Sequence, residues 1–402
     1  MRFGEAPPTA GLLPNWSDLA GRKRDPAFEH ELALFIGAPT VLLTSSGTAA
    51  LVLAMQWLAE RSPRRTVIVA AYTCPLVVLA AARAGLRVLP CDTVPGGFDL
   101  DLAHLARLLS PDTLAVIATH YGGALTDVAR LRESLDACAP GTPIIEDAAQ
   151  AFGAQWRGRS VGLAGDIGVF SFGVGKGFTI FQGGCLVSRS VATMVGLSGL
   201  SARLANPAPW AEFRASAQLC GYHAFYNPLG LRLVYGLPRR RWLRRGDEIK
   251  AVGDEFPDKI ELNRVGAWRQ RVGARALERL PAHLAATRAR FADLALRFAT
   301  IEGVSVHVPL PDASPTGLFL FVTLPTAGRC RRVLDRLWSS RLGVTKLFAR
   351  ALGDYEYLAR KLQPSDTPNA RDLAARTLTI TTSPWLGEPD VERIQAILRT
   401  SV

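Results

Sequence analysis

A lysine at position 176 lies between two glycines in an apolar stretch, FSFGVGKGFTIFQGG (170–184). Arginine supplies most of the positive charge of the chain, and lysine occurs at only six positions: 23, 176, 250, 259, 346 and 361. Arginine stays protonated in proteins, whereas a desolvated lysine can lose its proton and act as a nucleophilic amine. A nucleotide P-loop does not fit, because Gly175-Lys176 is followed by Gly177 instead of serine or threonine. The pattern favours a lysine that is used for its amine.

A candidate phosphate site lies upstream, in the run TSSGTAAL (44–51) between an apolar strand and a helix. The first amides of a helix and its dipole favour an anion, so Gly47, Thr48 and Ala49 are candidate ligands. Ser171, five residues before Lys176, would add a hydroxyl. The alternatives are an ordinary Ser/Thr helix cap and an ordinary strand serine.

The third candidate group is Glu146-Asp147-Ala148-Ala149-Gln150, at the end of an apolar strand. An acid in this position can hold a protonated ring nitrogen, and a nearby amide can bond a ring oxygen. A helix N-cap is the alternative explanation. A phosphate site, an acid and an amine are together what pyridoxal phosphate needs, because the acid keeps the ring able to accept electrons while the lysine binds the aldehyde and moves a proton.

Alternating strands and helices must position these groups. Apolar strands are expected at the start of 41–61, at 66–73, 86–92 and 114–123, within 143–154, and at 166–172 and 183–188. Helical patterns separate the first of them, which predicts an α/β fold with a mainly parallel sheet covered by helices on both faces. Ligands of such sheets gather where the strands end.

The second half of the chain has a different pattern. Residues 190–262 break the alternation, and helices and short strands follow from about residue 265, with strands near 304–308 and 318–324 and helices near 329–338 and 389–399. We therefore expect a large cofactor-binding domain at 1–262, with an unusual insertion at about 190–262, and a smaller C-terminal α+β domain at 263–402.

Composition excludes several classes of protein. The 402 residues are 48% hydrophobic and 20% charged, which is typical of a globular chain and not of a disordered one. The net charge of +12 is spread along the sequence without a nucleic-acid-binding signature, so no nucleic-acid partner is expected. The six scattered cysteines show no metal-binding spacing, and with no export signal we expect a cytoplasmic protein without a metal.

The motifs together resemble the DegT/DnrJ/EryC1/StrS aminotransferases, which are pyridoxal-phosphate enzymes of the aspartate aminotransferase fold type I. The resemblance covers most of 27–190 and, more loosely, 260–402. Its carriers are FEHELALFIG, SSGTAAL, AYTCPLVVLAAARAGLRVLPCD, IIEDAAQAFGA, GDIGVFSFGVGKG and FQGGCLVS. It implies a seven-stranded, mainly parallel sheet flanked by helices, with a smaller α+β domain after it.

The resemblance also implies catalytic roles. Lys176 would be the Schiff-base lysine, Asp147 the partner of the pyridine nitrogen, and Gln150 a contact of the ring hydroxyl. Most members of the family transfer an amino group from glutamate or glutamine to a keto group of a nucleotide-linked deoxysugar. Some members replace the lysine with histidine and act as dehydratases, which Lys176 argues against.

Other site residues follow from the same resemblance. Thr48, Ala49 and Ser171 would bind the cofactor phosphate, beside Gly47. Asn263 resembles an asparagine that reaches the cofactor site of the neighbouring subunit, since family members are homodimers with shared active sites.

Departures from the family leave the acceptor open, and one is the late segment of the family that here reads TTSPW (381–385). Cys74 stands at a cofactor-binding position where the family usually has an aromatic side chain stacked on the ring, and either Tyr72 or Tyr121 covers the ring instead or the ring is packed less tightly. Arg264-Val265 follows Asn263, where the family often has tyrosine and then arginine.

The segment 206–250 interleaves aromatic and aliphatic residues with seven arginines. It either packs on the dimer with a solvated basic face, which we favour, or contacts a membrane surface or a hydrophobic or polyanionic acceptor. The alternatives to a sugar aminotransferase are an aminotransferase for a lipid-like or other hydrophobic carbonyl compound, and a non-catalytic regulatory protein that binds the cofactor.

Overall fold

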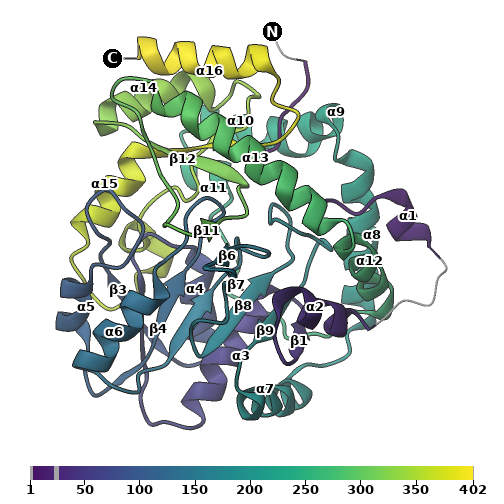
Figure 1. Cartoon of the computed structure of the whole chain (residues 1–402), viewed down its shortest axis with the longest axis vertical. Helices are drawn as coiled ribbons and strands as arrows, with labels where there is room; N and C mark the ends of the chain where they lie inside the picture. The colour runs from purple at the N-terminus through teal and green to yellow at the C-terminus, as the bar shows by residue number, and fades with distance from the viewer. Residues whose placement is uncertain (1–2, 22–26, 402) are drawn as a thin grey trace.

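The computed structural model describes residues 3–21 and 27–401, and a seven-stranded sheet forms its centre (Figure 1). The order of the strands is β1 (Val41–Thr44), β9 (Gly184–Val187), β8 (Ile167–Ser171), β5 (Ile144–Asp147), β4 (Thr113–Thr119), β2 (Thr66–Ala70) and β3 (Arg87–Cys91). Only β9 runs against its neighbours; the other strands are parallel to one another. The predicted mainly parallel sheet of seven strands is therefore confirmed.

Helices cover both faces of this sheet. One face packs against α3 (Gly47–Ala59), α4 (Pro75–Arg83) and α7 (Val191–Leu204). The other packs against α2 (Phe28–Ile36), α5 (Leu102–Leu108) and α6 (Val128–Cys138). Every residue of β2, β4, β5, β8 and β9 is buried, which explains why these strands read as continuous apolar runs.

Strands β2 and β4 are shorter than their apolar runs. The run 66–73 leaves the strand at Ala70, and the run 114–123 leaves it at Thr119. The residues beyond the ends turn into loops that stay buried, so hydrophobicity alone did not mark the ends of the strands. These loops carry Thr73, Cys74 and His120 to one edge of the sheet.

A smaller antiparallel sheet lies above the first in Figure 1, with the order β10 (Ser305–Val306), β12 (Phe319–Thr323), β14 (Thr377–Thr381) and β13 (Val344–Thr345). It shares a core with α13 (Leu280–Ala299), α14 (Ala327–Leu337) and α16 (Glu388–Thr400). The elements expected for a small α+β unit are thus present. The boundary at residue 262/263 stays a prediction, because α12 (Ala267–Leu277) packs in the core of the large sheet.

The insertion is a chain of short helices: α8 (Pro209–Phe225), α9 (Pro228–Leu231), a π-helix (Arg232–Gly236), α10 (Leu237–Arg244) and α11 (Glu248–Val252). The fully buried carboxylate of Glu5 fixes it to the N-terminal segment through Arg239 (3.2 Å) and Arg240 (2.7 Å). Several large apolar side chains of the insertion are exposed: Trp210, Phe213, Phe225, Leu229, Leu233, Val234 and Leu237. None of the helices in the described ranges is long and apolar enough to cross a bilayer.

Candidate functional site

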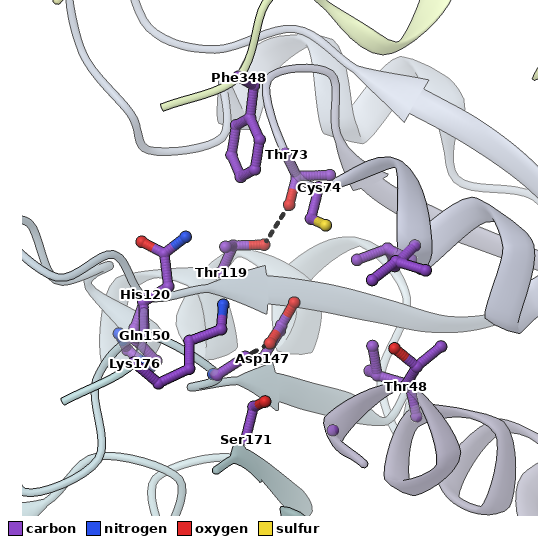
Figure 2. Close-up of a pocket in the computed structure, with 15 residues that line it drawn as sticks. Thr48, Thr73, Cys74, Thr119, His120, Asp147, Gln150, Ser171, Lys176 and Phe348 are labelled. Atoms are coloured by element: carbon purple, nitrogen blue, oxygen red, sulfur yellow. Dashed lines mark hydrogen bonds between the residues drawn. The ribbon is translucent and has the colours of Figure 1, made fainter. Parts of the chain in front are cut away.

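Lys176 lies in the loop that follows β8, and the N-terminal segment holds this loop in place. Gly175 adopts a left-handed backbone (φ +81°), which glycine tolerates without strain. Leu12 N donates to Gly177 O at 2.9 Å, and a Cβ added to Gly11 would lie 2.2 Å from Lys176 O, so the two segments are in close contact. The half-buried Lys176 side chain extends toward Asp147 in Figure 2.

Asp147 ends β5 and is almost completely buried. Burial raises the pKa of its carboxyl group, while a hydrogen bond from Ala149 N (3.1 Å) and the charge of Lys176 act in the opposite direction. A buried carboxylate with only one hydrogen bond from the described chain is stabilised by a cation placed against it. This environment fits the protonated ring nitrogen that the sequence predicts for the site.

The predicted phosphate end of the site lies where α3 meets β8. The Ser46 side chain caps α3 by accepting from Ala49 N (3.0 Å), as the helix-cap alternative proposed. A Cβ on Gly47 would lie 2.7 Å from Ser171 Cβ, so only glycine lets the first turn of α3 approach Ser171 this closely. Gly47, Thr48 and Ser171 line the pocket, whereas Ala49 is buried beside it with its amide held by Ser46.

His120 and Gln150 line the opposite side of the pocket. His120 Nε2 lies 2.9 Å from a Glu146 carboxylate oxygen, and its Nδ1 accepts from Thr126 N (3.2 Å). Because Nδ1 accepts, Nε2 carries the hydrogen and donates it to Glu146. Burial opposes the charge of Glu146, but hydrogen bonds from His120, Gly165 and Gly162 hold its pKa below the usual range. The imidazole ring of His120 is therefore fixed as a wall of the pocket.

The aromatic side chain that faces the pocket is neither of the two candidates from the sequence. Tyr72 and Tyr121 are buried and do not line the pocket, and Tyr121 OH donates to Tyr72 O at 2.5 Å. Phe348, from the loop after β13, lines the pocket instead (Figure 2). Its ring packs edge-on against that of Tyr72. Cys74 also lines the pocket, and burial raises the pKa of its thiol to about 12, so the thiol stays protonated at neutral pH.

Asn263 lies outside the pocket of its own chain. Its backbone N donates to Ser45 Oγ (3.3 Å), and its side-chain Nδ2 donates to the Glu261 carboxylate (3.1 Å). Asn263 lines a separate surface depression. Of the predicted site residues, the structure brings together Gly47, Thr48, Cys74, Asp147, Gln150, Ser171 and Lys176.

The pocket opens into a wider cleft of about 430 Å³. One wall of the cleft is formed by the start of α3 and the loop that carries Lys176. Residues 345–348, at the end of β13 and in the loop after it, form the other wall. The insertion closes one end with Tyr235, Val252 and Phe256. Local sequence patterns do not indicate these residues, because their position beside Lys176 depends on contacts between distant parts of the chain.

Asp254 fastens the insertion to the loop that carries Phe348. Its Oδ2 accepts from Ala349 N (2.7 Å) and from Tyr355 OH (2.6 Å), and Tyr357 OH donates to its backbone oxygen (2.5 Å). Burial raises the pKa of Asp254 to about 6, because it outweighs these hydrogen bonds. The carboxyl group therefore joins two walls of the cleft.

Asp254→Asn tests this contact. A carboxyl group whose pKa is raised from 3.8 to about 6 by folding stabilises the protein at low pH and loses that contribution as the pH rises toward 6. The free energy of unfolding falls by at most about 3 kcal/mol over this pH range because of Asp254. The asparagine variant does not show this fall, and its side-chain oxygen can still accept from Ala349 N and Tyr355 OH. We expect urea unfolding of the variant to show a smaller fall in stability between about pH 4 and pH 7.5 than the wild type. Equal pH dependence of the two proteins would contradict the role of Asp254.

Comparison with known proteins finds a family that part of this chain resembles. The model of the DegT/DnrJ/EryC1/StrS aminotransferase family matches residues 11–203. A 3-amino-5-hydroxybenzoate synthase of Amycolatopsis mediterranei (strain S699) is 36% identical over 162 residues, 40% of this chain and 41% of that protein. A dTDP-3-amino-3,4,6-trideoxy-alpha-D-glucose transaminase of Streptomyces venezuelae is 26% identical over 91% of this chain and 84% of that protein.

The alignments with the first curated relatives span only about two fifths or less of their length. Over nearly the whole chain, the fold matches that of the sugar aminotransferase CalS13 from Micromonospora echinospora, with a TM-score of 0.71, 23% identity and coverage of 97% of this chain and 98% of that one. The fold class expected from the sequence is confirmed. The family model of the DegT/DnrJ/EryC1/StrS aminotransferases matches residues 11–203, and these residues contain every residue that lines the pocket except Phe348.

Proposed function

We propose that the chain is a pyridoxal-phosphate-dependent aminotransferase, which takes an amino group from an amino acid, glutamate or glutamine, and transfers it to a carbonyl acceptor. The observation that carries this proposal is the pocket itself, which places the amine of Lys176 and the buried carboxyl group of Asp147 beside the first turn of α3. The match of the family model to residues 11–203 supports the same cofactor.

Each part of the pocket has a separate task in this proposal. Bound pyridoxal phosphate would supply an electron sink for the carbon that loses a proton. Asp147 would hold positive charge on the ring nitrogen, and Gly47, Thr48 and Ser171 would hold the phosphate at the α3 N-terminus. The Lys176 amine would take a proton from the donor carbon and later return one to the acceptor carbon. His120 and Phe348 would keep the ring in place and limit the access of water.

Reduction with borohydride followed by peptide mapping tests the proposal. The purified protein, incubated with pyridoxal phosphate and reduced, is expected to carry the cofactor on the peptide that contains Lys176. A protein that gains neither visible absorption nor a label on this peptide would refute the proposed activity.

We take a keto group of a nucleotide-linked deoxysugar as the leading acceptor. Support comes from the relative named as a dTDP-amino-sugar transaminase, to which the alignment extends over 91% of this chain. A hydrophobic or carbocyclic ketone is the second candidate, because Leu76, Val252 and Phe256 make part of the cleft apolar and the benzoate synthase is a relative at 36% identity. Single-turnover reactions of the aminated enzyme with keto-sugar nucleotides and with cyclic ketones distinguish the two acceptors.

We further propose that the active unit is a homodimer. Asn263 lies outside its own pocket, and the exposed apolar side chains of the insertion, such as Trp210 and Phe213, form a surface that a second copy would cover. Light scattering is expected to give a mass of twice 43.4 kDa. A monomer that binds anionic lipid vesicles through this surface would instead support the membrane contact considered from the sequence.

A further inference from the structure

The insertion contains a helix whose outer face is apolar. Helix α9, the π-helix and α10 follow one another without a break in the helical backbone, so residues 228–244 form one continuous helix. Its large apolar side chains that are between 46% and 58% exposed form what we call the outer strip: Leu229, Leu233, Val234 and Leu237. The three leucines are spaced by four residues, which places them on one side of the helix.

The inner face of the same helix is charged. Arg239, which is only 3% exposed, and Arg240 both donate to the buried carboxylate of Glu5. A Cβ added to Gly236 would lie 2.1 Å from a Glu5 oxygen, so the helix is pressed against this carboxylate. A helix on the surface of a soluble protein normally buries its apolar side chains and exposes its charged ones. Here the arrangement is reversed, and packing within the chain does not account for the leucines of the outer strip.

The N-terminal segment adds a further apolar side chain beside this helix. Glu5 N donates to Pro228 O at 2.8 Å, which holds the segment along the start of the helix. Phe3 is 69% exposed, and the Arg232 guanidinium lies over its ring at 4.8 Å from the centroid. The apolar surface therefore extends from the outer strip to Phe3.

The charge around the outer strip is of one sign. Residues 213–246 contain seven arginines and neither aspartate nor glutamate. Three of these, which we call the flanking arginines, are exposed at the end of α10: Arg241, Arg244 and Arg245. The next acids along the chain are already paired, Asp247 with Lys250 (3.4 Å) and Glu248 with Arg331 (2.5 Å). An exposed apolar face with arginines beside it is typical of helices that lie in the headgroup region of an anionic bilayer.

A second copy of the chain fits this surface poorly. In a two-fold contact each surface meets its own copy, so the flanking arginines would find no carboxylate on the other copy of 213–246. The dimer surface proposed above contains Trp210, near the start of α8, where Glu212 pairs with Arg269 of α12 (2.5 Å). Helix α8 has 17 residues and is about 25 Å long, and the helix with the outer strip follows its other end, in the upper part of Figure 1.

We propose that the outer strip and the flanking arginines form a docking surface for an anionic phospholipid bilayer. The helix would lie along the bilayer with its leucines in the headgroup region, and the arginines would contact lipid phosphates. Tyr235 of the same helix lines the cleft, so docking would bring the cleft close to the bilayer. The inference goes beyond the proposed aminotransferase function and does not depend on the chemistry at Lys176.

Sedimentation with lipid vesicles tests the docking surface. The full chain, loaded with cofactor, is mixed with vesicles of equal parts phosphatidylcholine and phosphatidylglycerol, or with vesicles of phosphatidylcholine alone. We expect the wild type to sediment with the anionic vesicles and to stay in solution with the neutral ones. Leu229→Gln combined with Leu233→Gln should weaken the binding about 100-fold, because each leucine at the interface contributes about tenfold. Arg241→Gln combined with Arg244→Gln should weaken it about 10-fold or more.

Leu296→Gln is the matched control, since Leu296 is a 73% exposed leucine on α13, outside the insertion. It should sediment as the wild type does. The substituted residues are all exposed, so thermal unfolding of each variant should match the wild type, and Leu233→Ser alone replaces the leucine pair if it does not. Borohydride labelling of Lys176 should be unchanged in every variant. A protein that sediments with anionic vesicles but takes no label would refute the aminotransferase and not the docking surface.

Three results would overturn the docking surface. The first is a wild type that stays in solution with anionic vesicles or sediments equally with neutral ones. The second is a leucine variant that sediments as the wild type does. The third comes from light scattering: if the leucine variant has a lower mass in solution than the wild type, the outer strip is an interface between copies of the chain.

Discussion

Lys176→Ala is expected to lower the rate of amino transfer by about 10⁴-fold, the upper part of the range for loss of a positioned acid–base group. The variant should also lose the borohydride-stable label, because Lys176 is the one lysine among the described residues that line the pocket. Lys176→Arg should be equally inactive, since the guanidinium group does not give up its proton at any pH at which the protein is folded. Single-turnover rates with a saturating amino donor measure the effect on chemistry apart from product release.

Lys361→Ala is the control for this experiment. Lys361 forms an ion pair with the exposed Asp258. Loss of such a surface ion pair lowers the stability of a protein only slightly. The control should keep the wild-type rate and label. If Lys176→Ala turned over donor and acceptor at the wild-type rate, the amine would have no chemical role, and the protein would have to act through another group. If neither the wild type nor Lys176→Ala transferred an amino group while the wild type carried the label, a regulatory role for cofactor binding would gain support.

The sequence was informative where the chemistry depends on local patterns. The run from Thr44 into α3 predicted a helix N-terminus at the edge of the sheet, and Ser46 does cap that helix. The run IIED predicted an acid at the end of a buried strand, which is where Asp147 lies. Parallel strands bring such ends to one edge of the sheet, so the pocket followed from the order of motifs along the chain.

The other wall of the cleft could not be predicted in this way. Phe348 lies far after Lys176 in the chain. The two residues line the same cleft only because the small sheet is placed over the large one. A β13 of only two residues gives almost no periodic pattern.

The two tyrosines considered as a cover for the cofactor ring show a second limit of prediction from sequence. Tyr72 and Tyr121 each lie two residues after the end of a strand, β2 and β4, and both side chains are buried. Tyr121 donates its hydroxyl hydrogen to Tyr72 O, so its polar end is satisfied inside the protein and not at the pocket. Distance along the sequence from a strand end thus does not tell which side of the loop a side chain occupies.

Asp147→Asn should change stability and activity in opposite directions. Burial raises the pKa of the Asp147 carboxyl group, so this group favours folding at low pH and loses its contribution as the pH rises through the folded-state pKa. Asparagine has the same shape and keeps an oxygen for Ala149 N, but it has no charge to desolvate. The cofactor-free variant should therefore be more stable than the wild type at neutral pH, and this advantage should vanish in acid.

With the cofactor present, the same substitution should be harmful. The neutral amide does not stabilise positive charge on the ring nitrogen, and loss of one such preorganised electrostatic contact lowers rates by about 10²- to 10³-fold. Pyridoxal phosphate should also raise the melting temperature of the variant less than that of the wild type, because the stabilisation by a ligand follows its affinity. Asp258→Asn, which removes an exposed carboxylate, should change neither quantity. Thermal unfolding with and without cofactor, beside single-turnover rates, tests both effects, and a variant destabilised without cofactor at neutral pH would show that Asp147 serves the fold and not the ring.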